Sequence, residues 1–367
     1  MTTFFLNRLA TEPHALAFAG QSTPWPVALA DQTTDPSLDE ALRGHVAAAG
    51  RLLTPVAADL LATTGRPVDL FGFAPNPARL GAAADATASV EGVALTQLGA
   101  LLDLEHLGYS VAQAKPLAVL GHSQGVLAVH MTRAIEAAGS IEAAGTTLDE
   151  ILAVAALIGA AGTRRVRELG LNPKYGEASP MLSVKGATRA QVEALVARVN
   201  NARGPISIAV TNSDNHHVLS GYPEDLAAFA LEAEREHQHQ AKLREQKLHG
   251  GTVFNPTLEY LEVTLPFHSP LMADAVEQTV AWAGACGFDQ DRTRALAAEV
   301  LLNHVDWNAR VKALFNAADP AKLWIVDLGP GNTLGKLIGN VVQGTGIGVV
   351  EATTLSERST LSTLESE

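Results

Sequence analysis

The stretch "PLAVLGHSQGVLAVH", residues 116–130, decides the fold. Its first part, "PLAVLG", is short and wholly apolar, as expected of a central parallel strand that is buried on both faces. The next five residues, "GHSQG", fit the pattern G-x-S-x-G, in which glycines allow a sharp turn from a strand into a helix and leave the serine side chain exposed. This context predicts that Ser123 is a nucleophile; the alternative is a small polar residue in a tight turn.

The composition narrows the class of protein. With 367 residues, 47% of them hydrophobic and only 18% charged, the chain can form one large or two modest globular units. A net charge of -13 argues against nucleic acid as a partner, because phosphate binding needs a basic face. Cys286 is the only cysteine, which excludes an intrachain disulfide and fits a cytoplasmic protein. Since no secretory signal and no apolar run of about 18 residues is present, neither export nor a membrane span is expected.

The order of the predicted elements indicates one α/β core with an insertion. The strand candidate "ALAFAG" ends in "GQSTPWP", so a loop begins at Gln21, and "LWIVDLG" and "GIGVVEAT" are the final strand candidates. Between them "MLSV", "TRAQVEALVARVN", "ISIAVTNS" and "HHVLSGY" alternate strand, helix, strand and strand, which suits a small antiparallel subdomain with helices on one face. We therefore predict a core of residues 1–179 and 263–367 with an inserted subdomain at 180–262.

A long apolar helix is predicted after the serine turn. The segment "TTLDEILAVAALIGAAGTRR" opens with Thr147 and Glu150 at the spacing of a capping box and ends in arginines. Its interior is unusually free of charge. The helix is therefore expected to begin near Thr147 and to be buried.

A serine hydroxyl needs a base to remove its proton before it can attack. Of the 12 histidines, His268 lies in "PFHSP", where Ser269 and Pro270 are a good N-cap and first residue of a helix. His268 thus falls on a strand-to-helix junction, where catalytic groups tend to collect. Its position alone fits a structural histidine equally well, and His122, next to the serine, is expected to be structural.

Six segments in a fixed order make the chain similar to a known family. The series "AFAGQST", "LTQLGALL", "GHSQG", "NSDNHHVLSG", "PFHSP" and "DLGPGNTLGKL" resembles the malonyl/acetyl-CoA:acyl carrier protein transacylases over nearly the whole chain. The segments "LIGAAGT" and "HGGTVFNP" make it most similar to the acetyltransferase domain of bacterial type I (FAS I) fatty acid synthases. The resemblance implies an α/β-hydrolase-like core with a parallel sheet plus an inserted ferredoxin-like α+β subdomain.

The resemblance also implies a catalytic site. Ser123 would be acylated by an acyl-CoA, and His268 would be its base, with the imidazole oriented by a main-chain carbonyl that we place near Val300. The oxyanion would be bound by the backbone N–H groups of Gln21 and Gln124, which requires the loop after "ALAFAG" to face the serine.

One departure from the family bears on the substrate. Members that accept malonyl groups carry an arginine on the helix after the serine, where it pairs with the malonate carboxylate, and in this chain Ile158 matches that position. A buried carboxylate facing isoleucine would be unpaired and costly, so a short uncharged acyl group such as acetyl is expected. Asn212 would line the acyl pocket. Ile158 also continues an apolar stripe with Ile151, Leu152 and Ala155, which fits core packing as well.

The implied activity is acetyl-CoA:acyl carrier protein S-acetyltransferase, acting by a ping-pong route in fatty acid synthesis. The coenzyme A thioester would be a substrate, with no permanently bound cofactor and no metal. The partners would be the phosphopantetheine thiol of acyl carrier protein and other domains of a multienzyme synthase. The alternatives that stay open are a serine thioesterase or esterase, a malonyl transferase that recruits Arg164 or Arg165, a palmitoyl transferase of the same family, and a docking domain without catalysis.

Acyl carrier proteins of this family are typically acidic, so docking would need a local basic patch. The densest positive charge lies in "GTRRVREL" and in "AKLREQKLHGG", which contains Lys242, Arg244 and Lys247. Both segments are candidates for the docking surface, and both also fit ordinary solvated faces.

Overall fold

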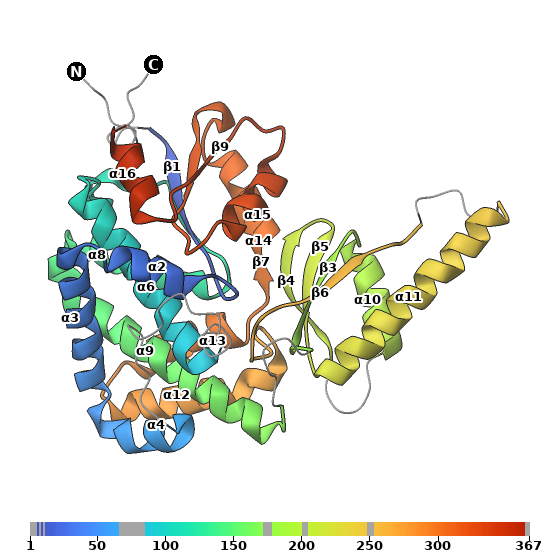
Figure 1. The fold of residues 1–367 in the computed structure, drawn as a ribbon, viewed down its shortest axis with the longest axis horizontal. Coiled ribbons are helices and arrows are strands. Elements are labelled where there is room, and N and C mark those ends of the chain that lie inside the picture. Colours follow the sequence, from blue (N-terminus) through green and yellow to red (C-terminus); the bar gives the residue numbers. More distant parts are fainter. Residues whose placement is uncertain are drawn as a thin grey trace.

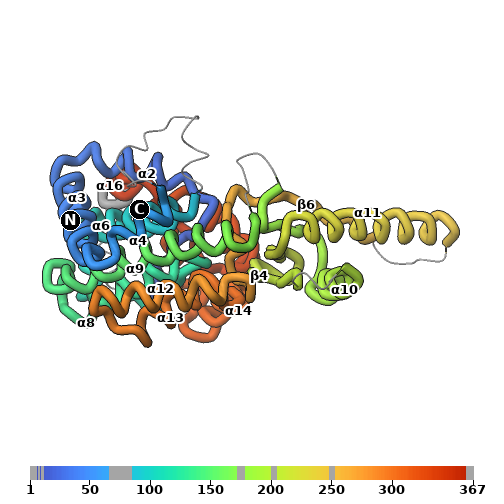
Figure 2. The backbone as a smooth tube through the Cα atoms, turned by 90° about the horizontal axis from the view of Figure 1, so that it is seen from below, coloured from blue at the N-terminus to red at the C-terminus, as the bar shows by residue number. Residues whose placement is uncertain are grey.

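Two β-sheets organise the chain (Figure 1). The computed structural model describes residues 12–65, 85–171, 178–199, 205–247 and 253–363, together with Leu6 and Leu9. One sheet lies among the helices of the core, and the other lies beside it with its own pair of helices. A tube view turned by 90° shows the same arrangement, with helix α11 (Pro223–Glu245) projecting away from the core (Figure 2).

The core sheet contains four parallel strands in the order β2-β1-β8-β9. They are β1 (His14–Phe18), β2 (Ala118–Gly121), β8 (Trp324–Asp327) and β9 (Gly348–Glu351). Every residue of β1 is buried, because this central strand has a neighbour on each side and helices above and below. The parallel sheet predicted from the apolar segments is confirmed, but the central place predicted for β2 is wrong, because among the described strands β2 lies at the edge and pairs only with β1. β2 leads directly into the serine turn.

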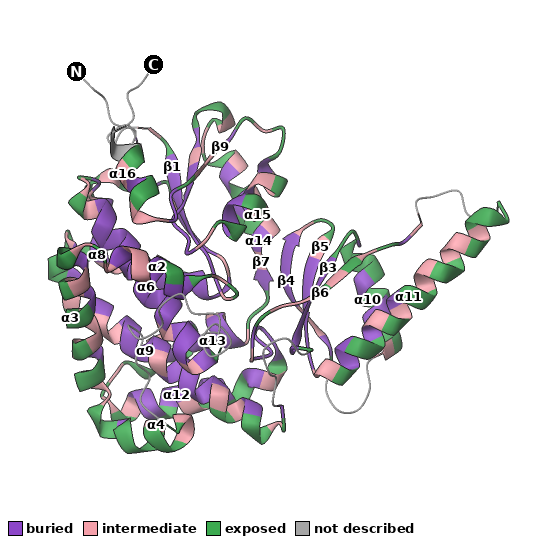
Figure 3. Ribbon diagram, viewed as in Figure 1, coloured by how far each residue is buried: buried purple, intermediate pink, exposed green. Residues whose placement is uncertain are grey.

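Helices surround this sheet, and most of their inward surface is buried (Figure 3). In chain order the helices and short 3-10 turns of this part are α2 (Trp25–Gln32), α3 (Pro36–Leu52), η1 (Thr54–Val56), α4 (Ala57–Thr64), α6 (Ala86–His106), α7 (Val111–Ala114), η3 (Ser123–Gly125), α8 (Val126–Ala138), α9 (Ile141–Glu168), η4 (Pro270–Met272), α12 (Ala273–Ala285), α13 (Gln290–Leu301), α14 (Trp307–Ala313), η5 (Leu314–Asn316), η6 (Pro320–Lys322), α15 (Thr333–Val342) and α16 (Leu355–Thr363).

The long apolar helix is α9, and it begins earlier than the sequence predicted. It starts at Ile141, where the hydroxyl of Ser140 accepts a hydrogen bond from the backbone N–H of Ala143 at 3.1 Å. Thr147 and Glu150 therefore lie inside the helix, and the predicted capping box is wrong. A cap is set by where the preceding chain turns, and here that turn follows Gly139, which has a φ of 86°.

By length and composition, α9 is apolar enough to span a membrane, with a mean hydropathy of 1.5 over its most apolar window. Of that window, 61% is buried inside the protein, where α9 packs against α6, α8 and α12. Its low charge is accounted for by this central place in the core, as expected for a helix that is covered on most sides.

The second sheet has five strands in the order β6-β3-β5-β4-β7. They are β3 (Met181–Lys185), β4 (Ser207–Ser213), β5 (His216–Ser220), β6 (Thr257–Tyr260) and β7 (Val305–Asp306). Helices α10 (Arg189–Val199) and α11 bury their apolar residues with this sheet in a separate core. β7 comes from outside the predicted insertion at 180–262 and pairs in parallel with β4, so it ties the second sheet to the core part of the chain.

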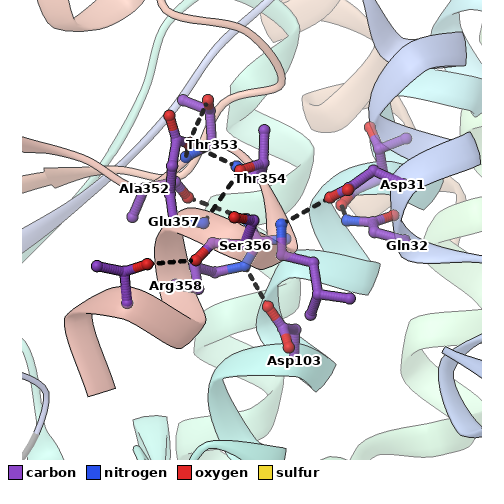
Figure 4. A network of polar contacts seen from close by, with 12 residues as sticks. Asp31, Gln32, Asp103, Ala352, Thr353, Thr354, Ser356, Glu357 and Arg358 are labelled. Atoms are coloured by element: carbon purple, nitrogen blue, oxygen red, sulfur yellow. Dashed lines mark hydrogen bonds and ion pairs between the residues drawn. The ribbon is translucent and has the colours of Figure 1, made fainter. Parts of the chain in front are cut away.

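The C-terminal helix α16 is held by a buried polar network (Figure 4). The guanidinium of Arg358 is fully buried, donates through Nε to the carboxylate of Asp103 on α6, and donates through Nη1 to the carbonyl of Ala352 at 2.9 Å. The first turn of α16 is capped by another helix, since the backbone N–H of Leu355 donates to the carboxylate of Asp31 at 2.7 Å. This network fixes the end of the chain against α6, the same helix that supports the candidate site.

Candidate active site

The serine turn is built around close contacts that only glycine permits. Ser123 follows β2 and has a φ of 53°, in the left-handed region, and α8 begins three residues later. A Cβ atom on Gly125 would overlap the carbonyl oxygen of Phe18, and one on Gly121 would overlap the backbone of Gly125 and Val126. The two glycines that flank the serine at a distance of two residues therefore allow the sharp turn that the motif predicted.

The turn brings Ser123 to His268. The Ser123 Oγ atom lies 2.7 Å from Nε2 of His268, and the ring Nδ1 lies 2.7 Å from the carbonyl oxygen of Asn303. Because a carbonyl only accepts hydrogen bonds, Nδ1 carries the hydrogen and Nε2 is left to accept the serine proton. The Ser123 hydroxyl, the His268 imidazole and the Asn303 carbonyl thus form one continuous chain of hydrogen bonds, although Ser123 and His268 are 145 residues apart in the sequence.

The carbonyl that orients the histidine belongs to Asn303, so the placement of that role near Val300 is wrong. Val300 lies inside α13, which ends at Leu301. The carbonyl of Leu301 accepts the backbone N–H of Ser269 at 3.2 Å, so the two chain segments run alongside each other just past the helix. The imidazole of His268 therefore meets a carbonyl beyond the end of the helix.

Burial sets the protonation state of His268. The residue is 2% exposed, and burial lowers the pKa of His268 to about 3, against the opposing effect of the hydrogen bond to Asn303. The nearby His122, His304 and Arg310 lower the pKa of His268 further, because positive charge beside the ring disfavours its protonated form. At neutral pH the imidazole is neutral, which is the form that can take a proton from serine.

The loop that contains Gln21 lies against the serine turn. A Cβ atom on Gly20 would lie 2.8 Å from Cβ of Ser123 and 3.3 Å from the backbone nitrogen of Gln124, so the two backbones are in contact. The side chain of Gln21 donates to Oε1 of Gln124. The two residues predicted to bind an oxyanion are therefore neighbours, and the role of their backbone N–H groups stays a prediction.

Helix α6 supports both loops, through residues for which the sequence suggested no role. The side chain of Gln124 donates to the carbonyl of Val90, and Gln97 donates to the carbonyl of Ala19 at 2.6 Å. Gln97 is fully buried and lies in "LTQLGALL", one of the family segments. A buried glutamine inside an apolar helix is the signal that could have pointed to this contact.

Asn212 and His122 join the serine turn to the second sheet. Nε2 of His122 lies 2.8 Å from Oδ1 of Asn212 on β4, and the ring of His122 meets Trp307 edge-on at 5.3 Å. Since Oδ1 is an acceptor, Nε2 of His122 donates, and burial lowers the pKa of His122. Asn212 is 4% exposed, so it lies inside the protein beside the serine turn, and its role in an acyl pocket stays a prediction.

Ile158 is fully buried on α9. One turn further along the same face, Gly162 packs against the side chain of Leu265, and two turns along, Arg165 donates to the carbonyl of Leu271 at 3.0 Å. This face of α9 therefore lies against residues 265–271, the segment that carries His268. The position agrees with a place near the acyl group, although core packing accounts for the burial equally well.

Arg164 and Arg165 are engaged elsewhere. Nη1 of Arg165 pairs with Asp274 at 2.9 Å, and Nε of Arg164 pairs with Glu168 at 2.9 Å. Their partners are acidic residues at the surface, so neither arginine is free to meet an acyl carboxylate at Ser123. The other basic segment lies at the far end of the projecting helix α11 (Figure 2), and its last part, residues 248–251, lies outside the described residues.

Comparison with known proteins shows which proteins this chain is similar to. The central segment, residues 180–260, matches the family model described as fatty acid synthase central AT domain. Fatty acid synthase beta subunit TOXC of Cochliobolus carbonum is 27% identical over 270 residues. The match covers 63% of this chain and only 12% of the relative, so the chain spans about an eighth of the curated relative.

Solved structures show the same fold. An acyl carrier protein S-malonyltransferase from Vibrio cholerae matches with a TM-score of 0.65 at 15% identity, covering 95% of this chain and 99% of that one. A malonyl-transacylase in complex with a type II acyl carrier protein matches with a TM-score of 0.66 at 16% identity, covering 95% and 98%. The α/β core with its serine turn is therefore the fold of the acyl carrier protein transacylases.

The sequence matches add a likeness to fatty acid synthases. Residues 180–260 are similar to the central AT domain of fatty acid synthases, and the curated relatives are fatty acid synthase subunits. The resemblance predicted from the six sequence segments is thereby confirmed.

Proposed function

We propose that the protein transfers an acyl group from coenzyme A to the phosphopantetheine thiol of acyl carrier protein through an acyl-Ser123 intermediate. The observation that carries this proposal is the 2.7 Å contact between Ser123 Oγ and an unprotonated Nε2 of His268. The relationship to fatty acid synthases supports a role in fatty acid synthesis.

The proposed reaction has two matching halves. His268 Nε2 takes the proton from Ser123 as Oγ attacks the thioester carbonyl, and the oxyanion accepts hydrogen bonds from the backbone N–H groups of Gln21 and Gln124. The C–S bond then breaks, and the imidazolium returns its proton to the coenzyme A sulfur. In the second half the carrier thiol gives its proton to Nε2, attacks the acyl-serine, and leaves with the acyl group as serine recovers the proton.

The partner of His268 supports a transferase in preference to a hydrolase. Its Nδ1 donates to a backbone carbonyl, whereas the alternative serine esterases and thioesterases normally use a carboxylate at that place. A neutral carbonyl stabilises the imidazolium less than a carboxylate does, so His268 is expected to be a weaker activator of the second nucleophile. A thiol is a better nucleophile than water and needs less activation, so transfer to a thiol is favoured over hydrolysis. Comparing loss of the acyl group to water with transfer to a thiol acceptor tests this point.

We propose acetyl as the acyl group. Ile158 replaces an arginine that would pair with malonate, and the nearby Arg164 and Arg165 are paired with acidic residues. Malonyl transfer is the second candidate, and the specific observation in its favour is that the solved structures described above are malonyl transferases by name. The two candidates differ by one carboxylate on the acyl group.

The deciding experiment is intact-mass measurement of the protein mixed with equal amounts of acetyl-, propionyl-, butyryl-, malonyl- and palmitoyl-CoA. Acetyl is expected as the dominant adduct, and Ser123→Ala is expected to carry none. A dominant malonyl adduct would establish the second candidate. An adduct that persists without Ser123 would remove the site itself.

The proposed chemistry needs no metal and no redox cofactor, because coenzyme A and the carrier both supply thiols. The curated relatives are several times longer than this chain, which supports a place among the other domains of a multienzyme synthase. The cytoplasm is the expected compartment, since this is where a chain with one cysteine keeps its thiol reduced.

A further inference from the structure

Glu91 is an exception within a buried helix. From Ala88 to Leu104 every residue of α6 is buried except Glu91, which is half-buried, and no other residue of the helix before Asp103 carries a charge. Carboxylates avoid such surroundings unless a cation or a hydrogen-bond donor meets them. Among the residues that the structure describes, none forms an ion pair or a hydrogen bond with the Glu91 carboxyl.

The residues on either side of Glu91 contact both loops of the candidate site. The carbonyl of Val90 accepts the side-chain N–H of Gln124, the residue after the nucleophile. A Cβ atom on Gly92 would lie 2.6 Å from the indole ring of Trp25, which is four residues beyond Gln21. The backbone of α6 at Glu91 is therefore part of the wall next to Ser123.

Helix geometry places Glu91 on the face of α6 that lies toward the helix carrying Ile158. Glu91 is one turn after Thr87, and residues four apart lie on the same helix face. Thr87 Oγ1 lies 2.8 Å from Oγ1 of Thr163 on α9, and the carbonyl of Ala86 is in close contact with Gly159. Glu91 and Ile158 are thus each within about one turn of the crossing between α6 and α9.

The crossing also lies next to the segment that carries the base. Gly162 on α9 packs against Leu265, three residues before His268. Helix α6 contacts the serine turn through Val90 and Gln124, and helix α9 contacts the segment that carries His268, so the crossing of the two helices lies beside the Ser123–His268 pair. Two acidic residues of α6 lie near this crossing: the exposed N-cap Asp85, which accepts a hydrogen bond from Thr163 at 3.4 Å, and the half-buried Glu91, which has no such partner among the described residues.

We propose that Glu91 is a specificity-determining residue that disfavours acyl groups carrying a carboxylate, such as malonyl, at Ser123. The proposal rests on the acyl transfer proposed above and adds a repulsive element to the missing arginine. A second carboxylate placed beside an unpaired one meets like-charge repulsion in surroundings that screen poorly, whereas an acetyl methyl group does not. Burial raises the pKa of Glu91 to about 7, so the carboxyl is charged in a large fraction of molecules at neutral pH.

The test is Glu91→Gln, which keeps the shape of the side chain and removes its charge. Equal amounts of malonyl-CoA and acetyl-CoA compete for Ser123, and the two adducts are read by intact mass. We expect the malonyl-to-acetyl ratio to rise at least tenfold over the unaltered protein. Glu105→Gln is the matched control, because Glu105 is also a half-buried glutamate on α6 but lies near the opposite end of the helix, and it is expected to leave the ratio unchanged.

Butyryl-CoA separates charge from space, since its acyl chain has about the length of malonyl and no charge. Its loading relative to acetyl is expected to stay constant in Glu91→Gln. An equal rise for butyryl and malonyl would overturn the proposal, because added room would then explain both. An unchanged or lowered malonyl ratio would also overturn it, the latter showing that the Glu91 carboxyl donates a hydrogen bond to malonate.

Two readouts keep the test interpretable. Thermal unfolding shows whether Glu91→Gln is folded. If Glu91→Gln does not fold, Glu91→Met, whose side chain is apolar and of similar length, is used in its place. The same rise in the malonyl-to-acetyl ratio is expected for Glu91→Met. Failure of the proposed function has a different signature, since the unaltered protein would then gain no acyl adduct on Ser123 from any donor. Adducts on Ser123 with a ratio indifferent to Glu91 would overturn this inference alone.

Discussion

Ser123 and His268 share an unusual backbone conformation: their φ angles are 53° and 57°, and their side chains meet at 2.7 Å. Left-handed backbone is disfavoured for residues with a Cβ, and such strain persists only where surrounding structure over-determines it. Each residue lies where an extended segment turns sharply into a helix or 3-10 turn. The strained conformations therefore belong to the geometry that brings the Ser123 hydroxyl and the His268 imidazole together.

Two substitutions of Ser123 distinguish the loss of its hydroxyl group from the release of backbone strain at its φ of 53°. Ser123→Ala and Ser123→Gly are both expected to lose the acyl adduct completely, because the hydroxyl is the attacking atom. Glycine tolerates a φ of 53°, so Ser123→Gly is expected to be more stable than Ser123→Ala by about 1 kcal/mol. Denaturant unfolding of the two variants measures the difference. Equal stabilities would show that the turn is not strained.

His268→Ala is expected to slow acylation on the order of a hundredfold or more, as loss of a general base typically does. Stopped-flow or quenched intact-mass kinetics with acetyl-CoA measure the rate. His122→Ala is the control variant and is expected to slow acylation less. Nε2 of His122 donates its hydrogen to Asn212, so this nitrogen is not available to take the proton of Ser123. Near-normal acylation by His268→Ala would assign the base elsewhere.

The pH dependence of acylation follows from the buried imidazole. Burial lowers the pKa of His268 to about 3, so the ring is already neutral at pH 5, where an exposed histidine would be mostly protonated. We expect the acylation rate to be nearly constant between about pH 5 and 8. A rate that falls in acid with a midpoint near 6.5 would contradict the buried, neutral base.

The lowered pKa of His268 also makes the stability of the folded protein depend on pH. The unfolded chain binds a proton on this histidine below about pH 6.5, whereas the folded protein does so only near pH 3. The contribution of His268 to stability is therefore fully present above pH 6.5 and is lost as the pH falls toward 3. His268→Gln is expected to unfold with a weaker dependence on pH across this window, measured by denaturant midpoints.

Ile158→Arg tests the acyl pocket. The new guanidinium is expected to raise malonyl loading and lower acetyl loading, because charge-assisted hydrogen bonds to a carboxylate contribute roughly 1.5 to 3 kcal/mol. Glu91 lies near the same helix crossing and would compete for the cation, so the double variant with Glu91→Gln is expected to load more malonyl than either single variant. A folded Ile158→Arg protein that still prefers acetyl strongly, with or without Glu91, would place Ile158 outside the pocket.

Asp103→Ala tests the attachment of the C-terminal helix (Figure 4). It leaves the fully buried guanidinium of Arg358 without its carboxylate, and losing one partner of a buried pair costs about 3 to 5 kcal/mol. Denaturant unfolding measures the loss. The double variant Asp103→Ala with Arg358→Met removes the buried charge as well and is expected to recover part of the stability. No recovery would show that packing, and not the unpaired charge, accounts for the loss.

Local patterns in the sequence predicted the parts of the site that depend on backbone geometry nearby. The apolar segments of β1, β2, β8 and β9 predicted a parallel sheet, but they did not separate the buried central strand β1 from β2, which lies at the edge of the described sheet, because helices cover apolar residues on both. The glycines around Ser123 predicted the turn, since no other residue fits between neighbouring backbones there. The base, His268, needed the family resemblance in addition to its place before a helix.

Tertiary structure alone decided which distant groups meet. The orienting carbonyl belongs to Asn303 and not to the region of Val300, because a backbone carbonyl has no sequence signature and its position depends on how the chain passes the end of α13. The start of α9 at Ile141 depended on the turn before it, although Thr147 and Glu150 had the right spacing. Glu91 is an ordinary helix residue until α6 lies against the serine turn and α9, since its burial without a counter-ion among the described residues arises only when the helices pack.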